Sequence, residues 1–294
     1  MPKKKKKPLL PELTLSRVAF WRRPSPDRAY SILQRVSDND LMMEPYPHLV
    51  IHDALPPDLY AALEASYPSQ ESILRGAKAA PNSRIDLNAR HILWNPSVDR
   101  TWRAFASYHT SGLFLQELVE RFGSVFDATH PEFESQIGRP LDRCRARVRK
   151  TSLFGEVETD CNVGINTPST QSTRVRGPHV DNPKELYAAL MYFRHPDDRS
   201  EGGALELYRS NPSTLSFHGL AEVRDELVEK VASVEYRANT MVLLFNSRES
   251  IHGVSARSPS PLPRRLVNII GETRRRMFAL SPLDEMVSEP RKAA

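Results

Sequence analysis

The sequence predicts an α+β protein whose core is a β-sandwich or jelly roll, buttressed on one face by helices that come earlier in the chain. Past Pro140, short apolar runs alternate with turn residues, as expected of several short strands. Before Pro140, the apolar residues between Leu115 and Phe122 follow the spacing of a helix that packs one stripe on a core. The expected strands read CRARVRKTSLF, LYAALMYFR, GALELYR, TMVLLFN, SIHGVSA and RRLVNIIGE.

Composition predicts one folded domain with appendages. The 294 residues suffice for one large core, and a content of 39% hydrophobic and 26% charged residues is ordinary for a globular protein. No run approaches the roughly 20 consecutive apolar residues of a bilayer-spanning helix, so no membrane partner is expected. The two cysteines, Cys144 and Cys161, are too few for a disulfide framework, and the basic start lacks the apolar core of an export signal, so we expect a cytoplasmic location.

The net charge of +5 comes from the start of the chain. Lys3 to Lys7 supply five positive charges, which leaves 41 − 5 = 36 Lys and Arg against 36 Asp and Glu. We expect a solvated, disordered tail here. Nucleic acid is not an expected partner beyond weak contacts made by this lysine run.

Four segments are expected along the chain. Residues 1–44 form the basic tail and an N-terminal extension with a short helix, and residues 45–140 form a helical buttress and an entry strand within the same domain as the core. Residues 141–280 form the β core. Residues 281–294 form a C-terminal tail.

The buttress is expected to start with a strand at Leu49 to Ile51. A helix then opens at Pro57, because proline is favoured in the first helical turn. The polar segment 69–95 shows no period and is expected to be a loop. A helix that begins near Thr101 is expected to end at Gly123.

Two stretches of the core are expected to depart from the strand pattern. Residues 220–231 are expected to form the single helical interruption of the core. Residues 162–173 are expected to form a flexible loop that acts as a lid.

The motif PHVDNP, residues 178–183, indicates a metal site. In an extended strand, residues two apart project to the same face, so His179 and Asp181 point at one ion while Val180 points away. Pro183 ends the strand because it has no N–H to donate to a ladder. The motif therefore provides half of a facial metal site.

The other half is expected at His252, in the apolar segment YRANTMVLLFNSRESIHGV. The separation of 252 − 179 = 73 residues leaves room for the strands that return the chain to the first histidine. Two histidines and one carboxylate suit Fe(II) and leave three of its positions open, as a bidentate 2-oxoacid plus O₂ requires.

Two arginines begin the strand PRRLVN, residues 263–268. A guanidinium at Arg264 or Arg265, 12 or 13 residues after His252, is expected to form a bidentate pair with the distal carboxylate of 2-oxoglutarate. Side chains alternate along a strand, so only one of the two arginines faces the interior of the core.

The motifs HVDNPKELYAALMYF, EGGALELY, NTMVLLFNSRESIHGV and RRLVNII, in that order, resemble the double-stranded β-helix core of the Fe(II)/2-oxoglutarate-dependent dioxygenases, especially the prolyl-hydroxylase-like branch. The likeness runs from about Arg143 to Glu272, less than half of the chain. It implies a jelly-roll, cupin-like core with His179, Asp181 and His252 as the iron ligands. Asp181 stands where halogenating members carry a small residue, which favours hydroxylation.

The same resemblance assigns the cosubstrate arginine to Arg264 or Arg265. Asn268 takes the place of a small polar residue often found four positions after the arginine of the family, which favours Arg264. Tyr192 is a candidate to hydrogen-bond the cosubstrate, with simple core packing as the alternative.

The implied reaction oxidises an unactivated C–H bond and releases succinate and CO₂ from 2-oxoglutarate. The expected substrate is a small molecule such as an amino acid, peptide or natural-product intermediate, and the oligomeric state stays open. One alternative is a hydroxylase of a ribosomal or nucleic-acid-associated protein, docked by the lysine tail. A second is a non-catalytic cupin-like binding module, which predicts a damaged triad or a missing arginine.

Overall fold

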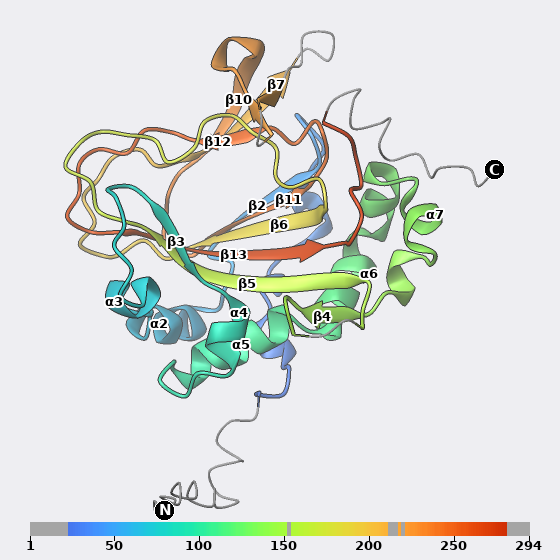
Figure 1. Ribbon diagram of the computed structural model, residues 1–294, viewed down its shortest axis with the longest axis horizontal. Helices are drawn as coiled ribbons and strands as arrows, with labels where there is room; N and C mark the ends of the chain where they lie inside the picture. Colours follow the sequence, from blue (N-terminus) through green and yellow to red (C-terminus); the bar gives the residue numbers. More distant parts are fainter. Residues whose placement is uncertain (1–22, 152–153, 211–216, 219–220, 281–294) are drawn as a thin grey trace, which may run out of the picture.

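The structure is a computed structural model that describes residues 23–151, 154–210, 217–218 and 221–280. The Lys3–Lys7 run and the C-terminal tail lie outside the described residues. Three layers are stacked: helices, a large sheet and a small sheet (Figure 1). None of the described helices has the length and hydropathy needed to cross a membrane.

The large sheet runs through the middle of the molecule and is antiparallel except for its pairing with β4. Its strand order is β1 (Leu41–Met42), β2 (His48–His52), β11 (Thr240–Phe245), β6 (Glu185–Tyr192), β13 (Arg264–Glu272), β5 (Val157–Asn166) and β3 (Arg84–Leu87), with β4 (Ala146–Val148) parallel to β5.

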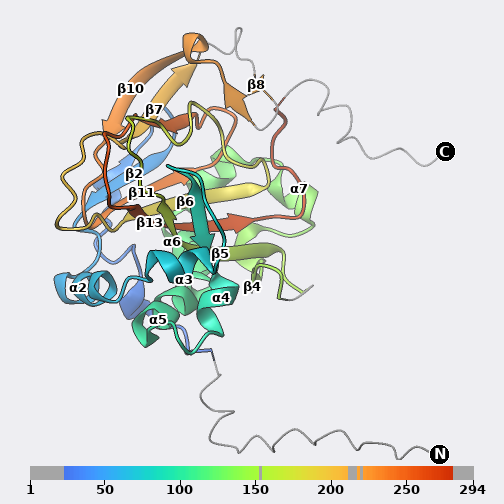
Figure 2. The same ribbon diagram turned by 60° about the vertical axis from the view of Figure 1, so that its left-hand side comes forward.

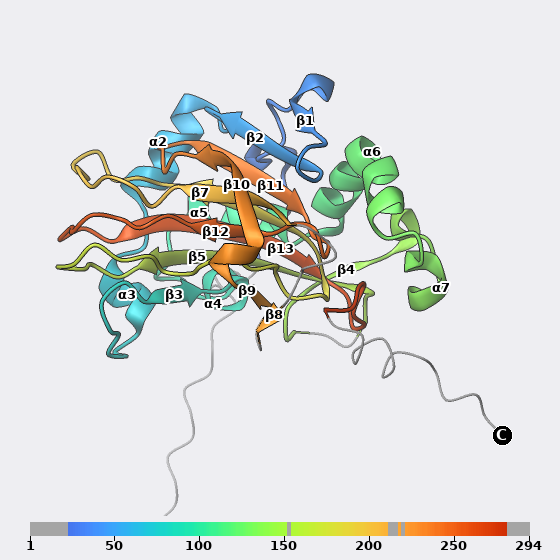
Figure 3. The ribbon, with the colours of Figure 1, turned by 90° about the horizontal axis from the view of Figure 1, so that it is seen from above.

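The small sheet lies over the inner face of the large one (Figure 3). Its order is β10 (Val228–Val234), β7 (Leu205–Ser210) and β12 (His252–Val254), and a hairpin of β8 (Phe217–His218) and β9 (Glu222–Val223) lies beside it.

Helices cover the outer face of the large sheet, as Figure 2 shows from a second side. They are α2 (Pro57–Ala65), α3 (Gln70–Leu74), α4 (Ala89–Leu93), α5 (Arg100–His109), α6 (Gly112–Thr129) and α7 (Phe133–Ile137). Short 3-10 turns occur at Arg28–Tyr30, Asp38–Asp40 and Leu141–Arg143, and a further one, Asp225–Leu227, lies between β9 and β10. Aromatic residues fill this layer: the fully buried Trp102 packs its ring against Phe105 and Phe193.

Strand β11 shows how the layers are joined. All six of its residues are buried. Met241 and its alternate neighbours pack into the cluster under the helices, whereas Val242 and Leu244 pack with Leu205 and Leu207 between the sheets. Two facing antiparallel sheets with helices on one side confirm the predicted α+β class with a jelly-roll core and an N-terminal buttress.

The entry strand and the helix opening at Pro57 are confirmed as β2 and α2. The loop expected over residues 69–95 is wrong, because this segment contains α3, β3 and α4. Strand β3 has the sequence RIDL, in which Arg84 and Asp86 line a polar cavity. A strand whose inward face is charged lacks the apolar alternation on which strand prediction depends.

Three other expectations about local structure are corrected. The helix expected over residues 220–231 is wrong, because the described residues of this segment form β9, a 3-10 turn and the start of β10. One face of β10 is exposed to solvent and carries charged residues, which gave the segment its misleading helical pattern. The loop expected over 162–173 starts too early, because residues 162–166 belong to β5, which ends at Asn166; its role as a flexible lid stays a prediction. The helix expected to stop at Gly123 bends at Phe122 (φ −130°, ψ 20°) and continues to Thr129.

In place of the short helix expected in the N-terminal extension, the described part of that segment has two 3-10 turns, Arg28–Tyr30 and Asp38–Asp40. The residues after the first turn nevertheless anchor the extension, because Ile32, Leu33 and Val36 are buried against the helical layer.

Candidate active site

Backbone pairing fixes the PHVDNP segment beside β12. The N–H of His179 donates to the carbonyl of His252 (2.8 Å), and the N–H of His252 donates back to the carbonyl of His179 (2.9 Å). On the other side, Val223 of β9 donates to the carbonyl of Pro178 (2.9 Å). The segment therefore joins the small sheet, and the reciprocal pair places the two imidazoles side by side with ring centroids 4.3 Å apart.

The two histidines and Asp181 converge as the spacing predicts. His179 Nε2 lies 3.6 Å from Asp181 Oδ1, and His252 Nε2 lies 3.5 Å from Asp181 Oδ2. One ligand atom from each residue falls within 4.8 Å of the others. Val180 points away into a separate apolar cluster. The triad thus fits the HxD…H motif that binds iron.

Each imidazole is oriented by a hydrogen bond at the nitrogen that faces away from Asp181. Nδ1 of His179 lies 2.8 Å from the carbonyl of Gly177, and Nδ1 of His252 lies 2.9 Å from the carbonyl of Ser250. A carbonyl only accepts, so Nδ1 carries the proton and the lone pair of Nε2 points toward the carboxylate. Both rings are therefore in the tautomer that ligates a metal.

Burial and charge give His252 and Asp181 the protonation states that a divalent cation requires. Burial lowers the pKa of His252 to about 4, although Asp181 opposes this change. Burial also opposes ionisation of Asp181, but His252, His179 and Arg176 outweigh it and hold the pKa of that carboxyl below its ordinary value. Near neutral pH His252 is neutral and the carboxylate is charged.

The triad lines a cavity of about 290 Å³ between the sheets, and Arg264 lines the same cavity. The side chain of Arg264 is only 3% exposed, and no Asp or Glu among the described residues forms an ion pair with it. Its Nε donates to the carbonyl of Gly203 (3.1 Å), and its guanidinium packs against the rings of Tyr192 and Tyr236, 4.9 and 4.7 Å from their centroids. A buried cation without a carboxylate is costly, so an anionic ligand is expected there.

Arg265 points to the opposite face of β13. Its guanidinium pairs with Glu64 of α2 (2.6 Å), donates to the carbonyl of Phe193 and lies over the ring of Tyr67. Of the two arginines between which the sequence left the choice open, Arg264 lines the cavity and Arg265 does not.

Tyr192 lies next to Arg264, on the interior face of β6. Its ring is fully buried, and its hydroxyl has no hydrogen-bond partner among the described residues. Asn268, whose position after the arginine favoured Arg264 in the sequence, lines the cavity together with the triad.

Sequence reasoning missed the charged wall that β3 contributes. Arg84 Nε donates to Asp86 Oδ1 (2.7 Å), and the pair lies directly over Gly164 of β5. A Cβ atom at residue 164 would fall 2.0 Å from Asp86 Oδ1, so glycine leaves space for the pair. The recurrence of charge at every second residue of RIDL was the available signal.

Comparisons with known proteins agree with this geometry. Residues 170–270 match the family profile described as "2OG-Fe(II) oxygenase superfamily". The segment contains every member of the triad together with Arg264 and Arg265. No curated protein matches the sequence.

Solved structures with the same kind of fold include prolyl 4-hydroxylases from Phytophthora capsici, which align with a TM-score of 0.51 and 16% identity over 86% of this chain and 68% of theirs. This likeness shows a double-stranded β-helix fold. A prolyl-4-hydroxylase from Pseudomonas putida (TM-score 0.39, 14% identity, 78% of this chain and 93% of that one) and a carbocyclase of nogalamycin biosynthesis (0.44, 12%, 85% and 88%) align less closely.

Proposed function

The chain belongs to the 2OG-Fe(II) oxygenase superfamily, and on that premise we propose that it hydroxylates an unactivated C–H bond of a small polar molecule such as an amino acid, a peptide or a natural-product intermediate. One observation carries the proposal: a buried arginine with no acidic partner among the described residues shares a cavity with a His-Asp-His triad. The arginine suits the distal carboxylate of 2-oxoglutarate, and the triad suits Fe(II).

His179, Asp181 and His252 would hold Fe(II). Their donor set of two imidazoles and one carboxylate fits this ion, and the hydrogen bonds at Nδ1 keep both rings aimed at it. Three ligands leave positions for a bidentate 2-oxoacid and O₂.

Arg264 would hold the distal carboxylate of 2-oxoglutarate. Its planar guanidinium can form two parallel hydrogen bonds with a carboxylate, which a lysine ammonium cannot do. The adjacent rings of Tyr192 and Tyr236 restrict its movement. The hydroxyl of Tyr192 is free to donate a further hydrogen bond to the cosubstrate.

Bound iron and 2-oxoglutarate supply the oxidising chemistry, in which O₂ is consumed, the C–H bond becomes C–OH, and succinate and CO₂ leave. The side chains of the chain determine where this happens. Leu190, Leu205, Val254 and Leu266 line the cavity and exclude water from the reacting centre. Positioning of the target carbon is the contribution of the protein to the rate.

The cavity supports a small, charged substrate. A volume of about 290 Å³ is at the low end for ligand sites and must also hold the cosubstrate, so only the reacting end of a substrate fits inside. Arg84 and Asp86 add one positive and one negative group to the wall, with side chains 27% and 35% exposed. Together they match the carboxylate and ammonium groups of an amino acid.

The experiment is a succinate assay with Fe(II), 2-oxoglutarate, O₂ and a panel of amino acids and short peptides. Substrate-dependent succinate is expected from the wild-type protein and none from His179→Ala. His52→Ala, which removes a histidine of β2 outside the cavity, is the matched control and should retain activity. The absence of turnover with every substrate, together with no binding of 2-oxoglutarate, would overturn the proposal.

The alternative of a protein substrate rests on the five lysines of the tail, which lie outside the described residues. It predicts salt-sensitive binding to ribosomes that disappears when residues 1–8 are removed. The binding-module alternative predicted a damaged triad or a missing arginine, and the cavity contains both intact.

A further inference from the structure

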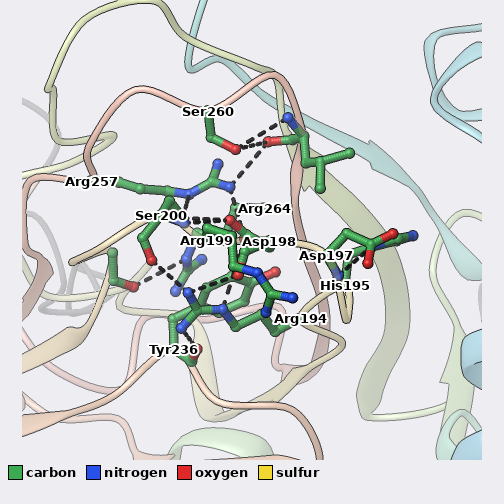
Figure 4. A network of polar contacts seen from close by, with 12 residues as sticks. Arg194, His195, Asp197, Asp198, Arg199, Ser200, Tyr236, Arg257, Ser260 and Arg264 are labelled. Carbon is green, nitrogen blue, oxygen red and sulfur yellow. Dashed lines mark hydrogen bonds and ion pairs between the residues drawn. The ribbon is translucent and has the colours of Figure 1, made fainter.

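A buried polar network lies behind Arg264, between the β6–β7 connection and the segment that leads into β13 (Figure 4). Asp198 has a fully buried side chain and forms an ion pair with Arg257, whose side chain is 7% exposed (Nη2 to Oδ2, 2.9 Å). Ser200 completes the unit: its hydroxyl donates to Asp198 Oδ1 (2.6 Å) and accepts from Arg257 Nε (2.8 Å).

This unit holds both backbone segments that determine where Arg264 points. Gly203, three residues after Ser200, accepts from Arg264 Nε (3.1 Å) and donates to the carbonyl of Ala256 (3.2 Å). Arg257 also donates to the carbonyl of Leu262 (3.0 Å), two residues before Arg264. One guanidinium therefore links the loop that contacts Arg264 to the start of the strand that carries it.

Glycine at 203 allows the backbone conformation that places its carbonyl against Arg264. Its φ of +70° is a conformation that residues with a side chain rarely adopt, and the side chains of Arg257 and Arg264 both lie beside it. Asp198 pairs with Arg257 (2.9 Å) and also with Arg194 (3.9 Å), whereas Arg264 forms no ion pair with an acidic residue among those that the structure describes.

The ring of Tyr236, which packs against Arg264, is held by the β6–β7 connection as well. Arg194 donates to the carbonyls of Tyr236 (3.1 Å) and Asp198 (3.2 Å), and Tyr236 packs its ring against the Arg264 guanidinium. Buried ion pairs contribute little net stability compared with apolar packing, so a stabilising role alone is a weak explanation for this one.

We propose that the Asp198–Arg257 ion pair positions Arg264 to grip the distal carboxylate of 2-oxoglutarate. The proposal rests on the proposed function, because it assumes that Arg264 binds that carboxylate. Asp198, Ser200 and Arg257 are positioning residues that act through Gly203 and Leu262 rather than by touching the cosubstrate.

The variant Asp198→Asn separates positioning from simple electrostatics, because the two predict opposite signs. It keeps the shape of the side chain but removes a negative charge near the ligand. If only electrostatics mattered, the loss of this negative charge would strengthen the binding of 2-oxoglutarate, which carries two negative charges, and would lower its Kd. Loss of positioning predicts that the Kd for 2-oxoglutarate rises about tenfold, as measured by calorimetry on the anaerobic Fe(II)-loaded protein. Unchanged or tighter binding would overturn the proposal.

A second pair of measurements uses Arg257→Lys, which keeps the charge but loses the fork that reaches Ser200 and Leu262. Its Kd for 2-oxoglutarate should also rise about tenfold, whereas its Kd for 2-oxobutanoate, which lacks the distal carboxylate, should stay unchanged. Equal weakening for both acids would indicate general damage to the cavity and would contradict the proposal. Ser200→Ala serves in the same comparison if Asp198→Asn does not fold.

Glu117→Gln is the matched control for removing a buried carboxylate. Glu117 is 2% exposed and pairs with Arg28 and Arg121 in the helical layer, away from the cavity. This variant should lower the free energy of unfolding without changing the Kd for 2-oxoglutarate. Arg264→Gln shows which of the two proposals fails. If Arg264→Gln leaves the Kd for 2-oxoglutarate unchanged, the proposed function fails as well. If Arg264→Gln raises this Kd but Asp198→Asn and Arg257→Lys do not, only the positioning proposal fails.

Discussion

Arg264 and Arg265 are adjacent in the chain but lie in opposite environments. Arg264 faces the space between the sheets, where two tyrosine rings and a carbonyl contact it and no carboxylate of the described residues neutralises it. Arg265 faces the helical layer, where Glu64 neutralises it. The alternation of a strand thus separates the charge that we propose binds a ligand from a charge that is paired within the fold.

The largest expected effect on this comparison comes from Arg264→Gln. Removing one partner of a buried charge pair costs about 2–5 kcal/mol, so the KM for 2-oxoglutarate should rise at least about 30-fold. The measurement is succinate formation at varied 2-oxoglutarate. A change of less than about threefold would show that Arg264 does not bind the cosubstrate.

The outer face of the sheet is predicted to affect stability rather than cosubstrate binding. Gly271→Ala would place a Cβ 2.4 Å from the buried ring of Tyr187, and overpacking of this kind lowers the free energy of unfolding by about 1–3 kcal/mol. Denaturant unfolding measures the loss. Gly164→Ala is the control on the inner face: it meets the tip of the Asp86 side chain, which can move, so its loss of stability should be smaller.

Part of the pH dependence of stability is predicted to come from His109 in the helical layer. Burial lowers the pKa of His109 to about 3, and its Nε2 accepts from the N–H of Ile32. The folded state thus resists a proton that the unfolded state accepts near pH 6.5, so the stabilisation is complete above that pH and is lost as the pH falls toward 3. His109 alone should lower the free energy of unfolding by about 1.4 kcal/mol for each pH unit below 6.5, and the buried His130 and His252, whose pKa values are lowered to about 4, add to this slope.

His109→Gln has no titrating group at this position and should remove that part of the slope. Denaturant unfolding of both proteins between pH 7 and pH 5 makes the comparison. Equal slopes would show that His109 does not contribute to the acid sensitivity.

The smallest expected effect is that of Arg265→Gln. Loss of a partly buried pair with Glu64 and of the contact with the Tyr67 ring should cost about 1 kcal/mol of stability. The KM for 2-oxoglutarate should not change. A rise comparable to that of Arg264→Gln would show that the two faces are not functionally separate.

The triad could be predicted from the sequence because its motif depends mainly on residues that are close together in the chain. His179 and Asp181 need only strand alternation to share a face, and His252 needs only a return of the chain. The choice between Arg264 and Arg265 needed the register of β13, which depends on its pairing with β5 and β6. A shift of one residue exchanges the two faces.

The remainder of the site depended on tertiary context. Arg84 and Asp86 make β3 too polar to be predicted as a strand, and only the cavity explains their position. The pairing of Asp198 with Arg257 joins residues 59 apart, and no local period indicates it. Solvent on one face of β10 similarly allowed charges that produced a wrong helix prediction.

The central claim is that one cavity holds Fe(II) at His179, Asp181 and His252 and 2-oxoglutarate at Arg264. The most direct measurement is anaerobic titration of 2-oxoglutarate into the protein with Fe(II), followed by calorimetry and by the visible absorption of the iron chelate. The wild-type protein should bind one equivalent with a coloured complex, His179→Ala should give no colour, and Arg264→Gln should need far more ligand. The same titration curve for all three proteins would contradict the account.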